Sequence, residues 1–392
     1  MLTIHLAPGR EARLHAGHPW IYRSEIARVS GEAPPGAIAR IEDHRGRFLG
    51  QATLNLASQI AARLIAHDEA PVTPAFLEAR IRRAGQRPGR SPVGPDACRL
   101  VFGEADHLPG LIVDRYADVL VLQILTAGME RWREAVVQAL QRVYTPRAIF
   151  ERSDASSRKL EGLEPRTGFA FGGGDTTVVI QEAGVAFFVD VAAGQKTGFF
   201  LDQRENRQVV RRLARERTVL DCFTYSGGFA LSAAAGGAAS VLGVDISPDA
   251  LAWAERSAGQ NGCAERCTWI VANAFDYLRA LVHERRRFGL IVLDPPAFTK
   301  GRQSVESALR GYHEINLRAM RLLAPGGVLV TCSCSYHVDT PLFLEMLRSA
   351  ADDAHREFRI LEGRTQASDH PILLAMKETQ YLKCVVLEAA EE

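Results

Sequence analysis

The chain contains 392 residues, of which 47% are hydrophobic and 24% are charged. This composition is typical of a folded globular protein and excludes a disordered or fibrous one, while the length favours two or three domains over a single core. No apolar run is long enough to span a bilayer and the N-terminus lacks the pattern of a signal peptide, so we expect a cytoplasmic protein without a membrane partner.

The charges and the cysteines exclude further classes. The formal net charge is only +1, so a nucleic-acid partner needs local evidence. Arginine suits bidentate phosphate contact, and five arginines crowd into one short segment, although a solvated helix end explains them equally well. They are Arg80, Arg82, Arg83, Arg87 and Arg90. The seven cysteines form no paired C-x-x-C clusters, so we expect neither a disulfide framework nor a metal site.

The first part of the chain, residues 1–70, is rich in short extended patterns broken by Gly and Pro. This pattern predicts a small β-barrel-like module. Two prolines, Pro71 and Pro74, then precede a helical pattern over residues 75–81. The following Gly-, Pro- and Arg-rich run over residues 85–95 predicts a loop.

Residues 71–184 are predicted to form a compact α+β domain. An amphipathic pattern indicates one helix over residues 130–142, and Gly172–Gly174 is predicted to be a hairpin turn. The expected strands of this part cover residues 111–114, 119–125 and 178–180.

From about residue 185 apolar strands alternate with helices. Their nearly continuous apolar character is typical of strands buried on both faces of a parallel sheet. These strands are predicted over residues 218–222, 241–245, 290–294 and 328–331. Ser247 can cap a helix that starts at Pro248 and ends before Gly262. The pattern predicts a doubly wound α/β domain with its site at the carboxyl edge of the sheet.

Two strand ends predict a cofactor site. Asp221 ends one strand and is followed by Gly227 and Gly228 before a helix, whose N-terminus suits the carboxylate of S-adenosylmethionine. Asp245 ends the next strand, where a carboxylate can accept both ribose hydroxyls, as in a nicotinamide dehydrogenase. The loop lacks the G-x-G-x-x-G spacing that a pyrophosphate needs, which favours a cofactor without phosphates. The alternative is that both carboxylates only cap helices.

Two later motifs bear on the reaction. Asp294-Pro295-Pro296 forms a rigid turn after the third strand, which suits an N-methyltransferase as well as an enzyme that methylates carbon 5 of a pyrimidine. Cys334 favours the second reaction, because a thiolate that adds to carbon 6 of cytosine activates carbon 5, and Asp294 can support the addition near ring N3. The alternative is that Cys332 and Cys334 are both buried strand residues.

The motifs together resemble the bacterial 23S rRNA cytosine-C5 methyltransferases of the RlmI type, over nearly the whole chain. The matching segments are Gly17–Trp20, Glu104–Tyr116, Gln195–Arg204, Asp221–Phe229, Asp294–Pro296, Ser333–Ser335 and Asp369–Pro371. The resemblance implies a PUA-like RNA-binding domain over residues 1–70, a central domain over 71–184 and a class I, Rossmann-like methyltransferase domain over 185–392. It also implies a 23S rRNA substrate and a homodimer.

The resemblance assigns the nucleophile to Cys334 rather than Cys332. The expected binding residues for S-adenosylmethionine are Asp221, Phe223, Thr224, Gly227, Asp245, Asn273 and Asp294. The expected RNA-binding residues are His18, Trp20, Arg23, Lys196 and Arg204, with a place in the core of the small barrel as the alternative for Trp20.

The chain departs from the resembled family at two positions. Ala297 stands where similar enzymes tend to have Lys, and Asn273 where they tend to have Asp, although an Asn oxygen can still accept a hydrogen bond from the adenine amino group. Two other functions remain open. They are an rRNA guanine-N7 or other N-methyltransferase, which would not need the Cys334 thiol, and a non-catalytic RNA-binding protein.

Overall fold

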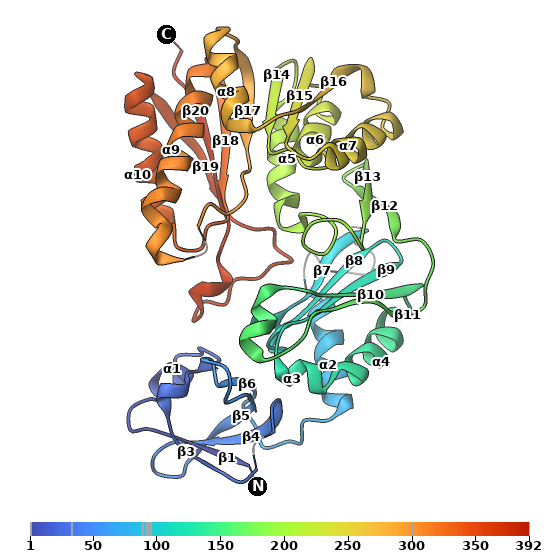
Figure 1. Cartoon of the computed structure of the whole chain (residues 1–392), viewed down its shortest axis with the longest axis vertical. Coiled ribbons are helices and arrows are strands. Elements are labelled where there is room, and N and C mark those ends of the chain that lie inside the picture. The colour runs from blue at the N-terminus through green and yellow to red at the C-terminus, as the bar shows by residue number, and fades with distance from the viewer. Residues whose placement is uncertain (1, 33, 88–89, 91–95, 300, 392) are drawn as a thin grey trace. The chain divides into compact units, whose positions relative to one another are not determined.

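The computed structural model describes residues 2–32, 34–87, 90, 96–299 and 301–391, and the chain divides into two compact units (Figure 1). The N-terminal unit comprises Met1–Ile180, Val189–Leu201 and Ser368–Thr379. The C-terminal unit comprises Gln181–Phe188, Asp202–Ala367 and Gln380–Glu392. Within the described ranges, no helix has both the length and the apolar character that crossing a membrane requires.

The N-terminal unit begins with a sheet whose described strands follow the order β2-β6-β5-β4-β1-β3. The strands are β1 (Thr3–Leu6), β2 (Trp20–Ile21), β3 (Ile26–Ser30), β4 (Ala37–Glu42), β5 (Phe48–Leu54) and β6 (Ala62–Ala66), with a short helix α1 (Ala12–His15). Alternate side chains such as Ile4, Ile41 and Leu54 form a buried core of their own. The strands predicted in this part of the chain are therefore present.

The same unit contains a second sheet, in the order β11-β10-β9-β8-β7, and a second core. Its elements are β7 (Ala97–Phe102), β8 (Leu111–Tyr116), β9 (Val119–Ile124), β10 (Ala148–Ser153), β11 (Arg166–Phe171), α2 (Pro74–Gly85), α3 (Ala127–Arg131), α4 (Arg133–Tyr144) and the 3-10 turns Gly103–Asp106 and Ser156–Glu161. Helix α2 starts where Thr73 caps it, because the Thr73 hydroxyl accepts the amide of Phe76 and Pro74 occupies the first position.

Two expectations for this region were wrong, and one lies partly outside the described residues. The single helix expected over residues 130–142 is two helices, because Trp132 leaves helical geometry with φ −100° and ψ 9°. The turn at Gly172–Gly174 joins no hairpin, because β12 (Thr177–Glu182) pairs with β13 (Val185–Asp190) and not with β11. The loop expected over residues 85–95 starts after α2, and its positions 88–89 and 91–95 are not described.

The C-terminal unit is a doubly wound α/β fold whose described strands follow the order β16-β15-β14-β17-β18-β20-β19. The strands are β14 (Thr218–Cys222), β15 (Ser240–Asp245), β16 (Cys267–Val271), β17 (Phe288–Leu293), β18 (Leu323–Ser333), β19 (Phe358–Arg364) and β20 (Lys383–Ala389). The first five are parallel, and β20 is antiparallel to both of its neighbours.

Helices cover both faces of this sheet (Figure 1). One face carries α5 (Arg204–Leu213), α6 (Gly228–Ala235) and α7 (Pro248–Gln260), and the other carries α8 (Ala274–His283), α9 (Val305–Leu322) and α10 (Thr340–Ala354). The predicted cap of α7 is confirmed, because the Ser247 hydroxyl accepts the amide of Ala250. The four strands predicted here are also confirmed, whereas β16, β19 and β20 were not predicted.

Candidate active site

Four of the predicted site residues lie at or just after the carboxyl ends of neighbouring strands of the C-terminal sheet. Asp221 lies in β14, Asp245 ends β15, Asp294 follows β17 and Cys334 follows β18. These strands are adjacent and parallel, so their carboxyl ends meet at one edge of the sheet. The topology therefore brings together residues that are more than a hundred positions apart in the sequence.

Asp221 is fully buried beneath this edge. Its Oδ2 accepts hydrogen bonds from the Thr224 hydroxyl at 2.5 Å and from the backbone amide of Ala230 at 2.9 Å. Its Oδ1 is buried and has no hydrogen-bond partner within the described part of the chain. Burial raises the pKa of Asp221 to about 7. A buried carboxylate oxygen with a remaining acceptor site suits a cationic amino group of a ligand.

The loop after β14 is held in an unusual backbone conformation. Phe223 and Tyr225 have φ values of 64° and 51°, which cost energy in non-glycine residues and recur at ligand-binding sites. Gly227 has φ 81°, and a Cβ there would lie 3.0 Å from the Ala254 Cβ and 3.1 Å from the Trp269 ring. The loop is therefore tightly packed from behind, and only glycine fits at its turn into α6.

Asp245 fixes the position of the same loop. Its Oδ2 accepts the backbone amide of Tyr225 at 2.8 Å, and its Oδ1 accepts that of Ser247 at 3.0 Å. Each oxygen of a carboxylate has two lone pairs, so both can accept a further hydrogen bond from a ligand hydroxyl. The expected alternative is partly correct, because Asp221 and Asp245 do hold amides at or near helix starts.

Asn273 lies just beyond β16 and is exposed. Its Oδ1 accepts the amide of Phe275 at 2.9 Å, so the residue is the N-cap of α8. One lone pair of this oxygen remains for the adenine contact, which stays a prediction.

Asp294 is positioned by a buried amide network. Its Oδ1 accepts a hydrogen bond from the Gln203 Nε2 at 2.9 Å, and the Gln203 Oε1 accepts one from the Asn206 Nδ2 at 2.6 Å. Arg364 in turn donates to the Asn206 Oδ1 at 2.9 Å. Gln203 was not among the expected site residues, although it lies in the segment Gln195–Arg204 that resembles the family.

The two neighbouring thiols lie in different environments. Cys332 is fully buried in β18 opposite Cys384 of β20. Its interaction with the Cys384 thiol and its burial raise the pKa of Cys332 well above the usual value. Cys334 lies one residue past the end of β18 and is partly exposed, with its Sγ 3.9 Å from the carbonyl oxygen of Pro295. Of the two, Cys334 is the thiol that a ligand at the sheet edge can reach.

A buried lysine lies next to the segment that carries this thiol, because Lys383 of β20 pairs with Ser333 of β18. The Lys383 Nζ donates to the carbonyl oxygens of Ser335 at 2.7 Å and Tyr381 at 3.0 Å. Burial lowers the pKa of Lys383 to about 8, while the charges of Cys334 and Asp339 act in the opposite direction. No signal in the sequence indicated Lys383, because its placement depends on the antiparallel pairing of β20 with β18.

Two of the expected RNA-binding residues are integrated into the N-terminal unit. The Trp20 indole N–H donates to the Glu104 Oε1 at 2.8 Å, which ties β2 to the second sheet. His18 is buried between Arg13 and Glu378. Its burial and, to a smaller extent, the charge of Arg13 lower the pKa of His18. Both residues therefore have partners within the unit, but Trp20 is half-buried and lies outside the barrel core, so its expected contact with RNA stays a prediction.

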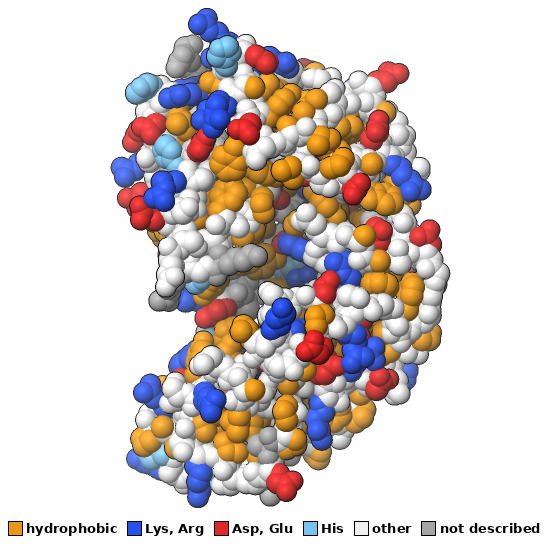
Figure 2. All heavy atoms as spheres, in the orientation of Figure 1, with side chains coloured by type: hydrophobic (Ala, Val, Ile, Leu, Met, Phe, Trp, Pro, Cys, Tyr) orange, Lys and Arg blue, Asp and Glu red, His pale blue; other side chains and the backbone are white. Residues whose placement is uncertain are grey.

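The other three expected RNA-binding residues differ in exposure. Arg23 is exposed and donates to the carbonyl oxygen of Leu56 at 3.1 Å, and Lys196 is exposed with its Nζ 4.5 Å from the centre of the Phe200 ring. Arg204, at the start of α5, is buried, which does not favour direct contact with a phosphate. Figure 2 shows Lys and Arg side chains interspersed with Asp and Glu on the visible face, consistent with the net charge of +1.

Two family models match the chain. Residues 124–370 match the S-adenosylmethionine-dependent methyltransferase family, and residues 4–67 match a PUA-like domain. Curated relatives include ribosomal RNA large subunit methyltransferase I of Aeromonas salmonicida, 44% identical over 98% of this chain and 99% of the relative. The same enzyme of Cronobacter sakazakii is 41% identical over 96% of this chain and 97% of the relative.

Solved structures support the fold. A protein from Streptococcus mutans described as a SAM-dependent methyltransferase aligns with a TM-score of 0.83 and 20% identity, over 99% of this chain and 100% of the other. A second structure, described as a methyltransferase complexed with SAH, aligns with a TM-score of 0.84 and the same identity and coverage.

Proposed function

We propose that this chain, which belongs to the S-adenosylmethionine-dependent methyltransferase family, methylates carbon 5 of a cytosine in 23S ribosomal RNA. The family match and the near-full-length similarity to ribosomal RNA large subunit methyltransferases establish the cofactor and the coarse activity, an rRNA methyltransferase with a PUA-like domain. The choice of base, of atom and of 23S rRNA is our inference, as are a cytoplasmic location and a homodimer.

The residues at the sheet edge fit S-adenosylmethionine. The buried Oδ1 of Asp221 suits its amino group, and the N-terminus of α6 suits its carboxylate. Asp245 has lone pairs for the ribose hydroxyls, and Asn273 has one for the adenine amino group. When bound, the cofactor supplies a methyl group on a positively charged sulfur.

Cys334 supplies the nucleophile that activates carbon 5 of cytosine. Its thiolate adds to carbon 6 and forms an S–C6 bond, which makes carbon 5 nucleophilic enough to take the methyl group. Loss of the carbon 5 proton to a base then restores the ring double bond and expels the thiolate. The target base must leave its stack to reach the sulfur.

Two charged groups support this chemistry. The Asp294 carboxyl, held by Gln203, lies at the same edge and is proposed to hydrogen-bond near ring N3 during the addition. Lys383 is a positioning residue, because its ammonium donates to the carbonyl of Ser335 and places positive charge near the Cys334 thiolate.

The observation that carries the proposal is the contrast between the two thiols. Cys334 is partly exposed beside the Asp294-Pro295-Pro296 turn, whereas Cys332 is sealed in the sheet. An N-methyltransferase needs no thiol at this place, because the nitrogen lone pair can attack the methyl group directly.

The N-terminal unit is proposed to bind the RNA and to add affinity rather than chemistry. Its first domain, residues 1–70, offers Arg23 as an exposed cation, while His18 and Trp20 support the surface around it. Lys196 is an exposed cation of the same unit, and the contribution of Arg204 is expected to be indirect because of its burial.

Mapping of 5-methylcytosine in rRNA tests the proposed function. The 23S rRNA from cells with and without the protein is compared by bisulfite sequencing, and the purified enzyme is added back to the unmodified RNA. We expect one cytosine to lose its methyl group without the protein and to regain it with the parent enzyme. Restoration of a methylguanine instead would refute the proposal and favour an N-methyltransferase.

A further inference from the structure

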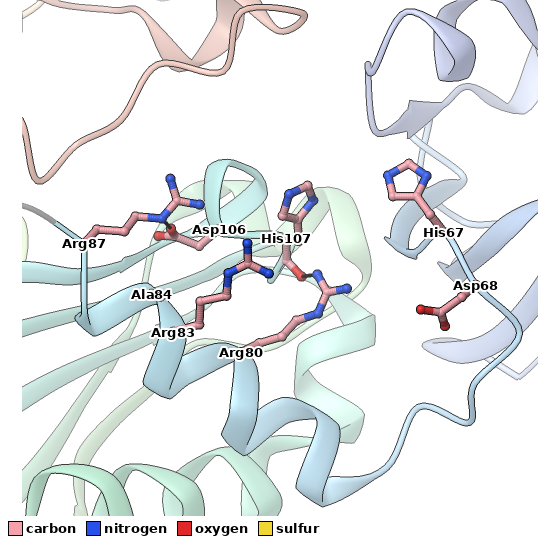
Figure 3. Close-up of a pocket in the computed structure, with 8 residues that line it drawn as sticks. All are labelled: His67, Asp68, Arg80, Arg83, Ala84, Arg87, Asp106 and His107. Atoms are coloured by element: carbon pink, nitrogen blue, oxygen red, sulfur yellow. Dashed lines mark hydrogen bonds and ion pairs between the residues drawn. The ribbon is translucent and has the colours of Figure 1, made fainter.

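A polar pocket of about 280 Å³ lies in the N-terminal unit, away from the residues assigned above (Figure 3). Its lining is almost entirely charged or polar, with one alanine, and consists of His67, Asp68, Arg80, Arg83, Ala84, Arg87, Asp106 and His107. Pockets for small organic ligands are mostly apolar, so this lining favours a charged group as the occupant.

Three arginines of the pocket come from α2 and the turn after it. Figure 3 shows Arg80, Arg83 and Arg87 extending on the same side toward His107, with His67 and Asp68 opposite. The spacing of three residues places Arg80 and Arg83 on one face of α2, and Arg87 follows in the turn after the helix. The local structure thus gathers cations that a solvated helix end would spread apart.

The arginines differ in how far their charge is already neutralised. Arg87 pairs with Asp106 at 3.0 Å, and Asp106 is shared with the buried Arg90 at 2.6 Å. Arg80 donates one N–H to the carbonyl oxygen of His107 at 3.1 Å. The Arg83 side chain is exposed and has no hydrogen bond or ion pair with any described residue.

The pocket therefore keeps an excess of positive charge. Among the lining residues, Arg80, Arg83 and Arg87 carry three positive charges against one negative charge each on Asp68 and Asp106, which leaves +1. The buried Arg90, which pairs with Asp106 without lining the pocket, raises the local sum to +2. Burial lowers the pKa of His107, and Arg80 adds to this effect, so His107 contributes no charge at neutral pH.

We propose that this pocket binds a backbone phosphate of the RNA substrate. The inference rests on the proposed rRNA substrate but not on which base is methylated. Arg83 offers its planar fork to the phosphate oxygens, and Arg80 adds the N–H groups that His107 does not use. Such contacts fix the position of a nucleic acid without reading its sequence.

A phosphodiester fits better than a free polyphosphate. A phosphodiester carries a single negative charge, which the net charge of +2 can neutralise. A nucleoside triphosphate carries more negative charge than the pocket can balance, and Asp68 on the lining would repel it.

Neighbouring arginines of α2 provide a matched test. Arg83 lines the pocket, whereas Arg82 is also exposed but pairs with Glu78 at 2.9 Å and does not line it. Binding of a labelled single-stranded oligoribonucleotide of mixed sequence is measured at several salt concentrations without cofactor, for the parent, Arg83→Gln and Arg82→Gln, and Arg80→Gln serves as a second pocket variant.

We expect Arg83→Gln and Arg80→Gln to weaken RNA binding and to reduce the slope of log affinity against log salt by about 0.7 for each lost phosphate contact. Arg82→Gln should leave both quantities unchanged, and all variants should keep the melting temperature of the parent. Equal effects of the Arg82 and Arg83 substitutions, or no effect of either pocket substitution, would overturn the proposal.

Two further arms separate the sources of failure. Inorganic pyrophosphate and ATP are used as competitors, and displacement of the RNA by either with Arg83-dependent affinity would show a small-anion site and overturn the proposal. A Cys334→Ser enzyme should retain the Arg83-dependent binding, because the assay requires no methylation. The phosphate site can therefore stand even if the proposed base or atom is wrong.

Discussion

Site residues were expected in two regions, at the carboxyl edge of the C-terminal sheet and on the N-terminal unit. The surroundings of these residues differ between the two regions. At the sheet edge, Asp221, Asp245 and Asp294 lie at or just after the ends of adjacent strands, and the buried Asp221 Oδ1 has no hydrogen-bond partner among the described residues. In the N-terminal unit, His18 and Trp20 are instead engaged by Arg13, Glu378 and Glu104.

The difference lies in what determines each position. Parallel strands have their carboxyl ends at one edge, so a polar residue at a strand end is placed by topology alone. A surface residue has no such constraint, and its role depends on partners far away in the sequence. Strand-end motifs therefore predict which residues lie close together, whereas isolated aromatic or basic residues do not, and the roles of both sets in binding stay predictions.

The largest expected effect separates the two thiols. Cys334→Ser should lower the methylation rate by about a thousandfold or more, since removing a catalytic nucleophile removes the covalent route. Cys332→Ser should cost mainly stability, because it places a hydroxyl in a buried pair with Cys384. Methyl transfer from labelled cofactor to rRNA measures the first effect, and thermal unfolding measures the second. Comparable loss of rate in both variants would contradict the assignment.

The next largest effect is expected from removal of the Asp245 carboxylate, which is proposed to bind the ribose hydroxyls. Asp245→Ala should weaken binding of S-adenosylmethionine by about 2 kcal/mol, or about thirtyfold, through loss of charge-assisted hydrogen bonds. Asp249→Ala is the control, because Asp249 is exposed in the first turn of α7. Titration calorimetry of both variants tests the placement, which an unchanged affinity of Asp245→Ala would exclude.

Cofactor binding should also depend on pH through Asp221. Its pKa is about 7 without ligand, and the ionised form is the one that attracts an ammonium group. Lowering the pH from 7.5 to 5.5 protonates the carboxyl, so the affinity should fall by about tenfold or more, and binding at low pH should release a proton. Calorimetry in buffers of different ionisation enthalpy detects that proton. Asp221→Asn should bind more weakly and lose this pH dependence, and a parent affinity that does not change with pH would argue against the contact.

The smallest expected effect sharpens the contrast in the N-terminal unit. Trp20→Phe removes the hydrogen bond to Glu104 and should cost about 1 kcal/mol of stability, with RNA affinity nearly unchanged. Arg23→Gln should lower the RNA affinity and leave the stability nearly unchanged, because Arg23 is exposed and its charge can reach a phosphate. Thermal unfolding and RNA binding at low salt distinguish the two variants, and a large loss of RNA affinity for Trp20→Phe would show that Trp20 itself contacts RNA.

The fold could be predicted where the physical signal is local. Apolar runs marked four parallel strands, and Ser247 with Pro248 marked the start of α7. The strand β19 was missed because it is mostly exposed and carries no continuous apolar run, whereas β20 was missed although Cys384–Leu387 is such a run. The interruption at Trp132 was missed because the amphipathic period continues across it.

The candidate site was predictable to a similar extent. The strand-end carboxylates and Cys334 could be named because their motifs lie on the chain itself. Gln203 and Lys383 could not, because each acts through a contact with a residue far away in the sequence, Asp294 and Ser335 respectively. The arrangement of α2 arginines in one pocket likewise depends on the turn that carries His107.

Covalent trapping on RNA that contains 5-fluorocytidine tests the central claim most directly. Fluorine at carbon 5 cannot be removed as a proton is, so the S–C6 bond formed by the nucleophile should persist after methyl transfer. We expect a denaturation-resistant complex with the parent enzyme and with Cys332→Ser, dependent on S-adenosylmethionine and mapped by mass spectrometry to Cys334. A complex with Cys334→Ser, or the absence of any complex while methylation of normal RNA proceeds, would contradict the account.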